Sequence, residues 1–486
     1  MVNSRAPAPI RAAADPLSRR DFLTLSAGAL AAGALGRAAR AQALEGVRNV
    51  NQNPKPRRPN IVLIMVDDMG WSDIGCYGGE IRTPNLDRLA AEGTRFTQFY
   101  NTARCCPSRA ALLTGLYPHQ TGVGHMIRDL GVPAYQGFLN DRCATLAEVL
   151  RPAGYATYMS GKWHVGEEPP HWPCRRGFDR YFGLISGACN YWRLEPPRRM
   201  AEDDRPFAPP TDGSFFMTDA FTERGIGMIR DHIAGPRAAD PFFLYLAYTA
   251  PHWPLHAHDE DIARYRNRYQ GGWDQLRVER HERQLAAGLV ERRWPLSPRH
   301  PKAPAWDSLS KEQKAVEAEK MAVYAAQVDR MDQGVGRVLR TLDELGIADD
   351  TVVIFLSDNG GCAEEVERSA DPKARTGTAD SFRSYGLPWA NASNTPLRLF
   401  KQFVHEGGIA TPLIARGPGI RRGVTTDAVG HVIDLAPTCL DYAGAAYPQT
   451  LEGRALTPQE GRTLRPLFGG GTRAGHETIF WEHQGH

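Results

Sequence analysis

Three unbroken apolar runs constrain the fold of this chain more than any other feature of its sequence. They lie at residues 61–66 (IVLIMV), 242–247 (FFLYLA) and 352–356 (VVIFL). A strand with one exposed face alternates apolar and polar residues, so continuous runs are typical of strands buried on both faces. Helical patterns separate the runs. Strands that alternate with helices predict an α/β fold with a large mixed, mostly parallel central sheet flanked by helices.

The clearest helical pattern extends from Ser310 to Gly346. Ser310 and Gln313 can form a capping box, in which side chain and backbone bond reciprocally at a helix start. An apolar stripe with helical spacing follows at Met321, Tyr324, Ala325, Val328, Met331, Val335 and Leu342. Gly346 suits the end of the helix. A shorter helix is expected at residues 84–90 and a strand at residues 94–100.

Two long segments show little periodicity. Residues 256–308 are charged and are expected to form an irregular insertion, whereas residues 360–394 are polar and rich in glycine and serine. A structureless stretch of that length is usually a binding loop or lid. The loops also hold aromatic residues that can either stack on a substrate ring or pack in the core, namely Tyr191, Trp192, Trp253, Trp273 and Trp389.

Polar side chains follow each of the three apolar runs. Asp67 and Asp68 follow the first run, His252 follows the second, and Asp358 and Asn359 follow the third. Ligands of parallel sheets gather at the carboxyl ends of the strands, so these side chains are expected to meet there. Carboxylate and amide oxygens suit calcium or magnesium rather than zinc or copper. Adjacent acids also serve as helix caps and in turns, and that reading stays open.

A thiol stands at the start of a predicted short helix, in the stretch Cys105-Cys106-Pro107-Ser108-Arg109. Proline suits the first helical turn because it lacks an N–H that would have no partner there. The free N–H groups and the positive end of the helix dipole then favour an anion near Cys105. Arg109 can add a forked cationic donor. The alternative is a cysteine that packs at a helix end as a small buried side chain.

Lys162 and His164 form a further candidate pair, inside residues 161–166 (GKWHVG). Side chains two residues apart point the same way on an extended chain, so both can reach one anion. A surface lysine beside a packing histidine would give the same pattern.

Composition excludes some classes of function. A net charge of +3, with no segregated basic strip, argues against nucleic acid as a partner. The eight cysteines are scattered without a CxxC pair, so no zinc site is implied and no disulfide connectivity is proposed.

The first residues resemble an export signal. Arg19 and Arg20 precede a modest apolar run at residues 25–35, and small residues suited to cleavage follow at 39–43. We therefore expect a twin-arginine signal peptide at residues 1–43, recognition by the twin-arginine translocase and a periplasmic location in a bacterium. The apolar run is too short to span a bilayer, so no stable membrane insertion is expected; an uncleaved anchor is the alternative.

Five stretches of the chain resemble motifs of the sulfatase family, in the family's order. Residues 105–115 match the signature C-x-P-S-R-x-x-x-L-T-G, and residues 161–166 are similar to GKWHLG. Residues 250–254 resemble P-H-x-P, and residues 395–401 resemble the segment whose lysine binds the substrate. The two acidic pairs match the calcium ligands of the family. On these motifs the chain is identified as a member of the sulfatase family, in the alkaline phosphatase superfamily.

The resemblance implies hydrolysis of sulfate monoesters, with aryl sulfates as the first class to test and glycan sulfates still open. It implies that Cys105 is oxidised to formylglycine (3-oxoalanine) by a formylglycine-generating enzyme. The hydrated aldehyde would be the nucleophile, and a covalent sulfo-enzyme would be the intermediate. The implied catalytic residues are Cys105, Arg109, Lys162, His164, His252, Asp358 and Lys401. The implied ligands of one Ca²⁺ are Asp67, Asp68, Cys105 as formylglycine, Asp358 and Asn359.

Each implied catalytic residue has a role. Asp358 would accept a proton from the hydrate, and Lys162 and Lys401 would stabilise charge on the sulfuryl oxygens. His252 would protonate the departing alcohol or phenol. His164 would take the second hydroxyl proton. Arg109, within the signature itself, would hold the hydrate.

The expected organisation has four parts. A signal peptide (1–43) and a linker (44–59) precede an alkaline-phosphatase-like catalytic domain (60–425). Residues 426–486 would begin a smaller α+β subdomain. Family members continue beyond this point, so we expect that subdomain to be incomplete, with an exposed edge strand at residues 479–482.

Two alternatives to a sulfatase are considered. A phosphonate or phosphate ester hydrolase of the same superfamily shares the cysteine motif. A non-catalytic, calcium-bound periplasmic protein would keep Cys105 as a thiol.

Overall fold

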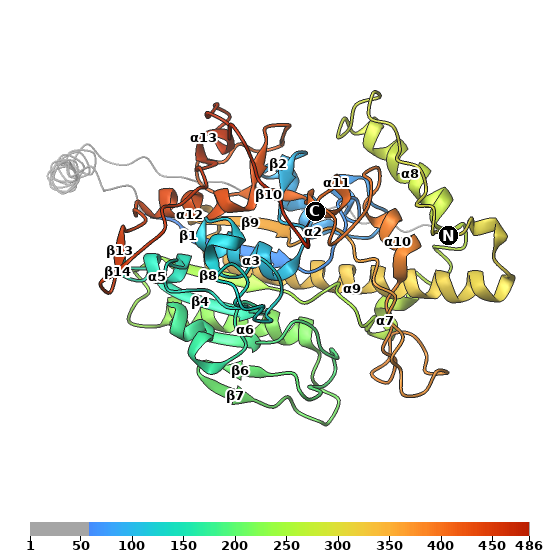
Figure 1. The fold of residues 1–486 in the computed structure, drawn as a ribbon, viewed down its shortest axis with the longest axis horizontal. Coiled ribbons are helices and arrows are strands. Elements are labelled where there is room, and N and C mark those ends of the chain that lie inside the picture. The colour runs from blue at the N-terminus through green and yellow to red at the C-terminus, as the bar shows by residue number, and fades with distance from the viewer. Residues whose placement is uncertain (1–57, 486) are drawn as a thin grey trace, which may run out of the picture. The chain divides into compact units, whose positions relative to one another are not determined.

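The computed structural model describes residues 58–485, and a ten-stranded sheet runs through them (Figure 1). The strand order is β11-β2-β10-β9-β1-β8-β4-β5-β6-β7. The five central strands from β9 to β5 are parallel, whereas β10, β6 and β7 pair antiparallel. The predicted α/β fold with a large, mostly parallel sheet is confirmed. In sheet order the strands are β11 Val424–Thr426, β2 Thr94–Phe96, β10 Leu413–Arg416, β9 Thr351–Ser357, β1 Asn60–Val66, β8 Phe242–Ala247, β4 Ala156–Gly161, β5 Arg180–Leu184, β6 Met200–Glu202 and β7 Arg205–Phe207.

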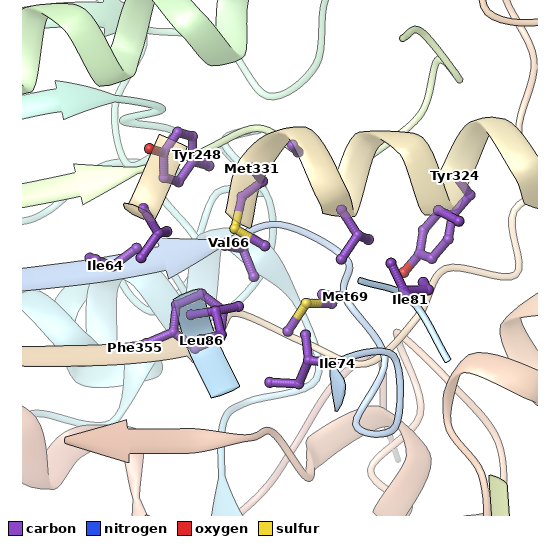
Figure 2. Close-up of a cluster of buried hydrophobic side chains, with 14 of the residues drawn as sticks. Ile64, Val66, Met69, Ile74, Ile81, Leu86, Tyr248, Tyr324, Met331 and Phe355 are labelled. Carbon is purple, nitrogen blue, oxygen red and sulfur yellow. The ribbon is translucent and has the colours of Figure 1, made fainter. Parts of the chain in front are cut away.

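Helices cover both faces of the sheet, and the alternation of side chains along β1 shows why the run is apolar throughout. Ile61, Leu63 and Met65 pack in one core with residues of α3, α5 and α12, whereas Val62 and Ile64 pack in the other with residues of α2, α6 and α9. Figure 2 shows part of the second core. These helices are α2 Pro84–Ala91, α3 Cys105–Thr114, α5 Leu146–Leu150, α6 Met217–Ala234, α9 Lys311–Glu344 and α12 Leu435–Ala443.

The long helix α9 forms as its sequence predicts. The side-chain oxygen of Ser310 accepts a hydrogen bond from the Gln313 backbone N–H at 3.2 Å, and Gln313 Oε1 accepts one from the Ser310 N–H at 2.8 Å. Every residue of the predicted apolar stripe is buried. Gly346 follows the helix with φ +67°, a left-handed conformation that favours glycine.

Two predicted strands are corrected. Residues 94–100 form two strands because they pair with different partners: β2 joins the large sheet, and β3 (Phe99–Tyr100) pairs with β12 (Gly430–His431). Residues 479–482 form no strand, because side chains rather than a backbone ladder hold them. Trp481 donates to the Asn101 carbonyl oxygen at 2.8 Å, and Glu482 contacts His119.

The segments predicted to be irregular contain helices. Residues 256–308 include α7 (Asp259–Ala263) and α8 (Gly272–Ala286), and residues 360–394 include α10 (Gly386–Ser393). A buried aromatic cluster joins the two segments: Trp273 and Trp389 lie 5.3 Å apart between ring centroids. The many charged residues of α8 obscured its helical pattern, because its buried face itself includes two arginines, Arg277 and Arg280. The remaining short elements are α4 Pro118–Thr121, α11 Glu406–Ile409, β13 Thr450–Leu451, β14 Arg454–Ala455 and α13 Arg465–Phe468.

A buried ion network fixes the loop that follows β1. Arg280 of α8 has a fully buried side chain and lies 2.7 Å from Asp73 Oδ1 and 2.8 Å from Glu80 Oε2. Asp73 Oδ2 also accepts hydrogen bonds from the Tyr324 hydroxyl at 2.7 Å and the Gly70 N–H at 2.9 Å. Helices α8 and α9 are thereby tied to the chain segment that carries the first acidic pair.

The expected signal peptide lies outside the described residues, as does most of the expected linker. Within residues 58–485, no helix combines the length and the apolar character needed to cross a membrane.

We expect Arg280→Met to destabilise the protein strongly. Removal of one member of a buried ion network leaves an uncompensated buried charge, which typically costs about 3–5 kcal/mol. Differential scanning calorimetry should show a clearly lower unfolding midpoint. Arg283→Met is the matched control: Arg283 lies at the exposed edge of the same network, 3.6 Å from Glu80 Oε2 with a 38% exposed side chain, and its loss should lower the midpoint much less. Equal midpoints for the two variants would contradict the role given to Arg280.

Candidate active site

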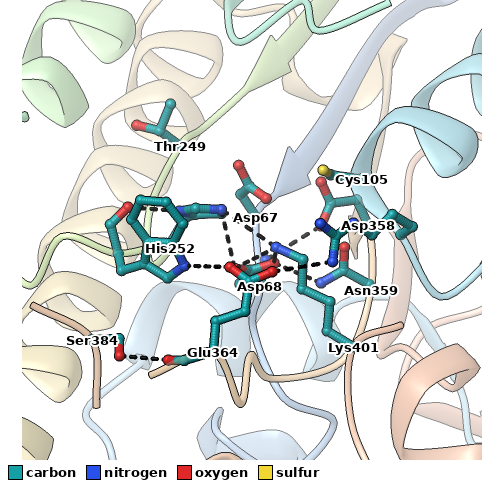
Figure 3. Close-up of polar contacts among 12 residues, drawn as sticks. Asp67, Asp68, Cys105, Thr249, His252, Asp358, Asn359, Glu364, Ser384 and Lys401 are labelled. Carbon is teal, nitrogen blue, oxygen red and sulfur yellow. Dashed lines mark hydrogen bonds and ion pairs between the residues drawn. The ribbon is translucent and has the colours of Figure 1, made fainter. Parts of the chain in front are cut away.

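Four neighbouring strands, β9, β1, β8 and β4, deliver polar side chains to one edge of the sheet. They are parallel, so their carboxyl ends meet there. Helix α3 begins at Cys105 at the same place, as its sequence predicts, and the loop after α10 adds Lys401 (Figure 3). The structure thus brings together all the predicted site residues: Asp67, Asp68, Cys105, Arg109, Lys162, His164, His252, Asp358, Asn359 and Lys401.

Asp68 is the centre of one group of contacts (Figure 3). Its Oδ1 lies 2.7 Å from Lys401 Nζ and accepts a hydrogen bond from Asn359 Nδ2 at 2.7 Å. Its Oδ2 lies 3.4 Å from His252 Nε2. Burial lowers the pKa of Lys401, but Asp68, together with the nearby thiols of Cys362 and Cys105, raises it well above its usual range. Lys401 therefore stays an ammonium group.

A second group joins two further carboxylates to two cations. Arg109 donates to Asp358 Oδ2 from Nε at 3.0 Å and from Nη2 at 2.8 Å, and Lys162 Nζ pairs with Asp67 Oδ2. None of these four side chains is exposed. Burial raises the pKa of Asp67, but Lys162 and other cations lower it to about 2. Burial and the charge of Asp67 raise the pKa of Asp358 well above its usual range.

Two oxygen atoms of the site lack hydrogen-bond partners in the described part of the chain, although each carboxylate is paired with a cation. Asp67 Oδ1 and Asn359 Oδ1 are buried, and neither finds a hydrogen-bond partner within residues 58–485. A buried acceptor without a partner typically costs about 1–3 kcal/mol. A hard divalent cation takes carboxylate and amide oxygens as ligands. The donor set therefore fits the predicted Ca²⁺.

Cys105 lies at the start of α3 with 1% of its surface exposed. Its Sγ atom is 3.6 Å from His164 Nδ1. A hydrogen bond with Cys106 lowers the pKa of the Cys105 thiol well below its usual range, against the effect of burial, and the charge of Lys162 lowers it further. The environment at this position therefore stabilises negative charge, as the predicted anion site requires.

His164 is held as a neutral imidazole. Burial, together with the positive charge of Lys162, lowers the pKa of His164 to about 4. The ring packs against Gly187, where a Cβ atom would lie 2.4 Å from the imidazole, so only glycine leaves room for it. A neutral imidazole beside residue 105 can accept a proton there.

His252 has a fixed orientation. Its Nδ1 lies 2.6 Å from the Trp253 carbonyl oxygen and must carry the hydrogen of that bond. Nε2 then faces the site, 3.4 Å from Lys401 Nζ. In its doubly protonated, imidazolium form, a histidine held in this way can present a proton from Nε2 to a group bound in the site.

Backbone strain is concentrated around these side chains. Five residues in or next to the site have a left-handed backbone with φ between +57° and +81°; they are Asp68, Ala103, His164, Leu399 and Gln402. Such conformations cost about 1–3 kcal/mol each outside glycine and cluster at functional sites. The surrounding structure therefore holds the side chains in place at the expense of local stability.

A cavity of about 110 Å³ opens onto the site. Its lining includes loop residues that no motif pointed to: Arg104, Met126, Gly187, Ala188, Arg198 and Glu364. Glu364 accepts hydrogen bonds from Trp253 Nε1 at 2.9 Å and Gln402 Nε2 at 2.8 Å, and it pairs with Arg104 at 3.2 Å. Of the five loop aromatics, Trp253 lines this cavity, Tyr191, Trp273 and Trp389 are buried in the core, and Trp192 is partly buried against it.

The chain is similar to sulfatases along most of its length. The family model described as Sulfatase matches residues 59–445. An arylsulfatase of Klebsiella aerogenes is 35% identical over 436 residues, which cover 84% of this chain and 92% of that protein. An uncharacterised sulfatase of Schizosaccharomyces pombe is 37% identical over 469 residues, which cover 89% and 84%.

A solved structure is also similar to this chain. The crystal structure of Ps i-CgsB in complex with k-i-k-neocarrahexaose has a TM-score of 0.60 and 27% sequence identity to this chain. The match covers 85% of this chain and 76% of that one.

We expect Ca²⁺ to raise the unfolding midpoint of metal-depleted protein. A ligand that binds the native state alone, at 100 times its Kd, stabilises by about 2.7 kcal/mol. Differential scanning fluorimetry with CaCl2, against KCl of equal ionic strength, measures the shift. Asn359→Leu should abolish it. Asp332→Asn, which changes a buried carboxylate on α9, should keep it. An equal shift in the Asn359 variant would place the ion elsewhere.

Proposed function

The chain belongs to the sulfatase family and is a sulfuric ester hydrolase, and we propose that it cleaves aryl sulfates with a formylglycine made from Cys105 and one Ca²⁺. The observation that carries this proposal is the meeting of Cys105, three buried carboxylates and two orphaned oxygens at one edge of the sheet. The aryl class is favoured by the similarity to an arylsulfatase, of which the match covers 92%.

Four side chains would hold the ion, together with an oxygen of the modified residue 105: Asp67, Asp68, Asp358 and Asn359. When bound, Ca²⁺ supplies a Lewis acid that stabilises negative charge on sulfuryl oxygens. Lys162 and Lys401 pair with the two aspartates that follow β1. These ammonium groups add fixed positive charge at the same place, where water is excluded and electrostatic stabilisation is strong.

Formylglycine at residue 105 would supply a hydrated aldehyde with two hydroxyls, one as the nucleophile and one for release of the sulfate. A general base beside residue 105 must accept the first proton. We assign this role to Asp358 because its carboxylate meets Cys105 in the site (Figure 3) and interacts electrostatically with it. Arg109 holds that carboxylate through two hydrogen bonds to Oδ2.

The remaining proton transfers fall to the two histidines. His252 lines the cavity, with Nε2 3.4 Å from Lys401 Nζ. It would give a proton from Nε2 to the departing phenol oxygen, next to the charge of Lys401. His164 Nδ1 lies 3.6 Å from the Cys105 sulfur and, as a neutral imidazole, would take the second hydroxyl proton. The two imidazoles therefore act on different oxygens, one of the substrate and one of residue 105.

We also propose that the protein is exported to the periplasm by the twin-arginine route. Arg19 and Arg20, the apolar run at 25–35 and the small residues at 39–43 support this proposal. N-terminal sequencing of material from a periplasmic extract tests it, and a mature start near residue 44 is expected.

Replacement of Cys105 tests the proposed nucleophile. Peptide mass analysis of active protein should show that residue 105 has lost its sulfur. Cys105→Ala should lower the rate of sulfate release by about 10³ or more, because the covalent route is removed. Cys106→Ser changes the adjacent buried thiol and is the matched control, expected to retain most of the rate. Full activity with sulfur still present at residue 105 would refute the proposal.

The pH dependence tests His164. Because the pKa of His164 is lowered to about 4, the imidazole stays unprotonated, and able to act as a base, well below its ordinary range near 6.5. The acid limb of kcat that His164 causes should therefore be centred near pH 4, with activity lost as the pH falls through that value. A steady-state profile from pH 3.5 to 8 measures it. A His164-dependent limb near 6.5 would contradict the assignment.

A further inference from the structure

Arg198 lines the cavity of the site, on the loop between β5 and β6. Its neighbours hold this part of the loop in place. The Ile185 N–H donates to the Arg199 carbonyl oxygen at 2.9 Å, and the Arg199 N–H donates to the Ser186 hydroxyl at 3.1 Å. Gly187, which follows Ser186, packs against His164. Arg198 is therefore presented to the site by backbone contacts rather than by a free surface loop.

Arg198 and Arg199 differ in what their side chains contact. Arg199 Nη1 lies 3.1 Å from Glu168 Oε1, and its side chain is 46% exposed. Arg198 is half-buried and lines the cavity, and no ion pair or side-chain hydrogen bond joins its guanidinium to any residue from 58 to 485. Glu195, three residues before Arg198 in the same loop, forms an ion pair with Arg193 at 2.9 Å. Arg198 is thus a residue of the cavity lining whose positive charge has no ion-pair partner within residues 58–485.

The other charged groups of the cavity lining are already paired. Lys401 pairs with Asp68, and Arg104 pairs with Glu364. Glu364 also accepts two further hydrogen bonds, so its oxygens are engaged. The reacting sulfuryl group would in addition have Lys162 and the proposed Ca²⁺ close by. The guanidinium of Arg198 is thus the one positive charge of this lining, within residues 58–485, that lacks a counter-charge.

We propose that Arg198 binds a second anionic group of the substrate. The favoured substrates would then be sulfate esters whose ring also carries a second oxyanion, which is either a carboxylate or another sulfate group. A guanidinium binds such groups with two parallel hydrogen bonds, which gives geometric selectivity as well as affinity. Trp253, held through its Nε1 by Glu364, offers an aromatic face in the same cavity. This inference rests on the proposed hydrolysis of sulfate esters and adds a specificity-determining residue to it.

Matched pairs of esters test the proposal. The substrates are 3- and 4-sulfooxybenzoate, each with its methyl ester as the neutral counterpart, and kcat/KM is measured by sulfate release. Arg198→Gln removes the charge, and Arg199→Gln is the control because Arg199 is paired with Glu168. Each variant is compared with the wild type on the same ester, so differences in leaving-group reactivity cancel.

Arg198→Gln should lower kcat/KM for at least one carboxylate isomer by about ten- to a hundredfold, the range of a hydrogen bond to a charged group. The same variant should leave both methyl esters within about twofold, and Arg199→Gln should change neither class. Equal losses on carboxylates and methyl esters would show that Arg198 acts on the reacting sulfate and would overturn the proposal. So would an unchanged rate on both carboxylates. Absence of sulfate release by the wild type is a different result, the failure of the proposed aryl sulfatase activity itself.

Discussion

Three carboxylates buried side by side are the constraint on which the rest of this structure depends. Asp67, Asp68 and Asp358 lie at the ends of two paired strands and carry almost no exposed surface. Carboxylates buried together are stable only when cations surround them. The chain meets this requirement with one cation for each acid, drawn from a strand end, a helix start and a distant loop. At the same place Asp68 has a left-handed backbone, and two buried oxygens, Asp67 Oδ1 and Asn359 Oδ1, have no hydrogen-bond partner within residues 58–485.

The centre of the fold and most of the site could be predicted because both follow from the same local pattern. An apolar run followed by Asp67 and Asp68 predicts a strand that is buried on both faces and that ends before these two aspartates. Parallel pairing then brings Asp358 and His252 to the same edge without further information. Lys401 is different, since it follows no strand, and only its resemblance to a family segment placed it in the site.

The parts that could not be predicted depend on contacts between distant residues. The strand expected at residues 479–482 has suitable side chains, yet Trp481 is held by the Asn101 carbonyl and no partner strand is present in the described part of the chain. Arg280 sits in a charged helix that resembles a surface element, although its guanidinium is buried between Asp73 and Glu80. Arg198 belongs to no sequence motif. Only the structure shows that its loop lines the cavity of the site.

The depth of Cys105 has a consequence for biosynthesis. In the folded chain 1% of this residue is exposed, and its Sγ atom lies 3.6 Å from His164 Nδ1. If Cys105 is oxidised as proposed, an enzyme acting on its thiol would have to reach a side chain that the folded chain buries. The oxidation would then have to precede the packing of α3 on the sheet and would compete with folding in time. A chain that folded first would keep the thiol and the correct architecture, so the yield of active molecules would depend on kinetics rather than on stability.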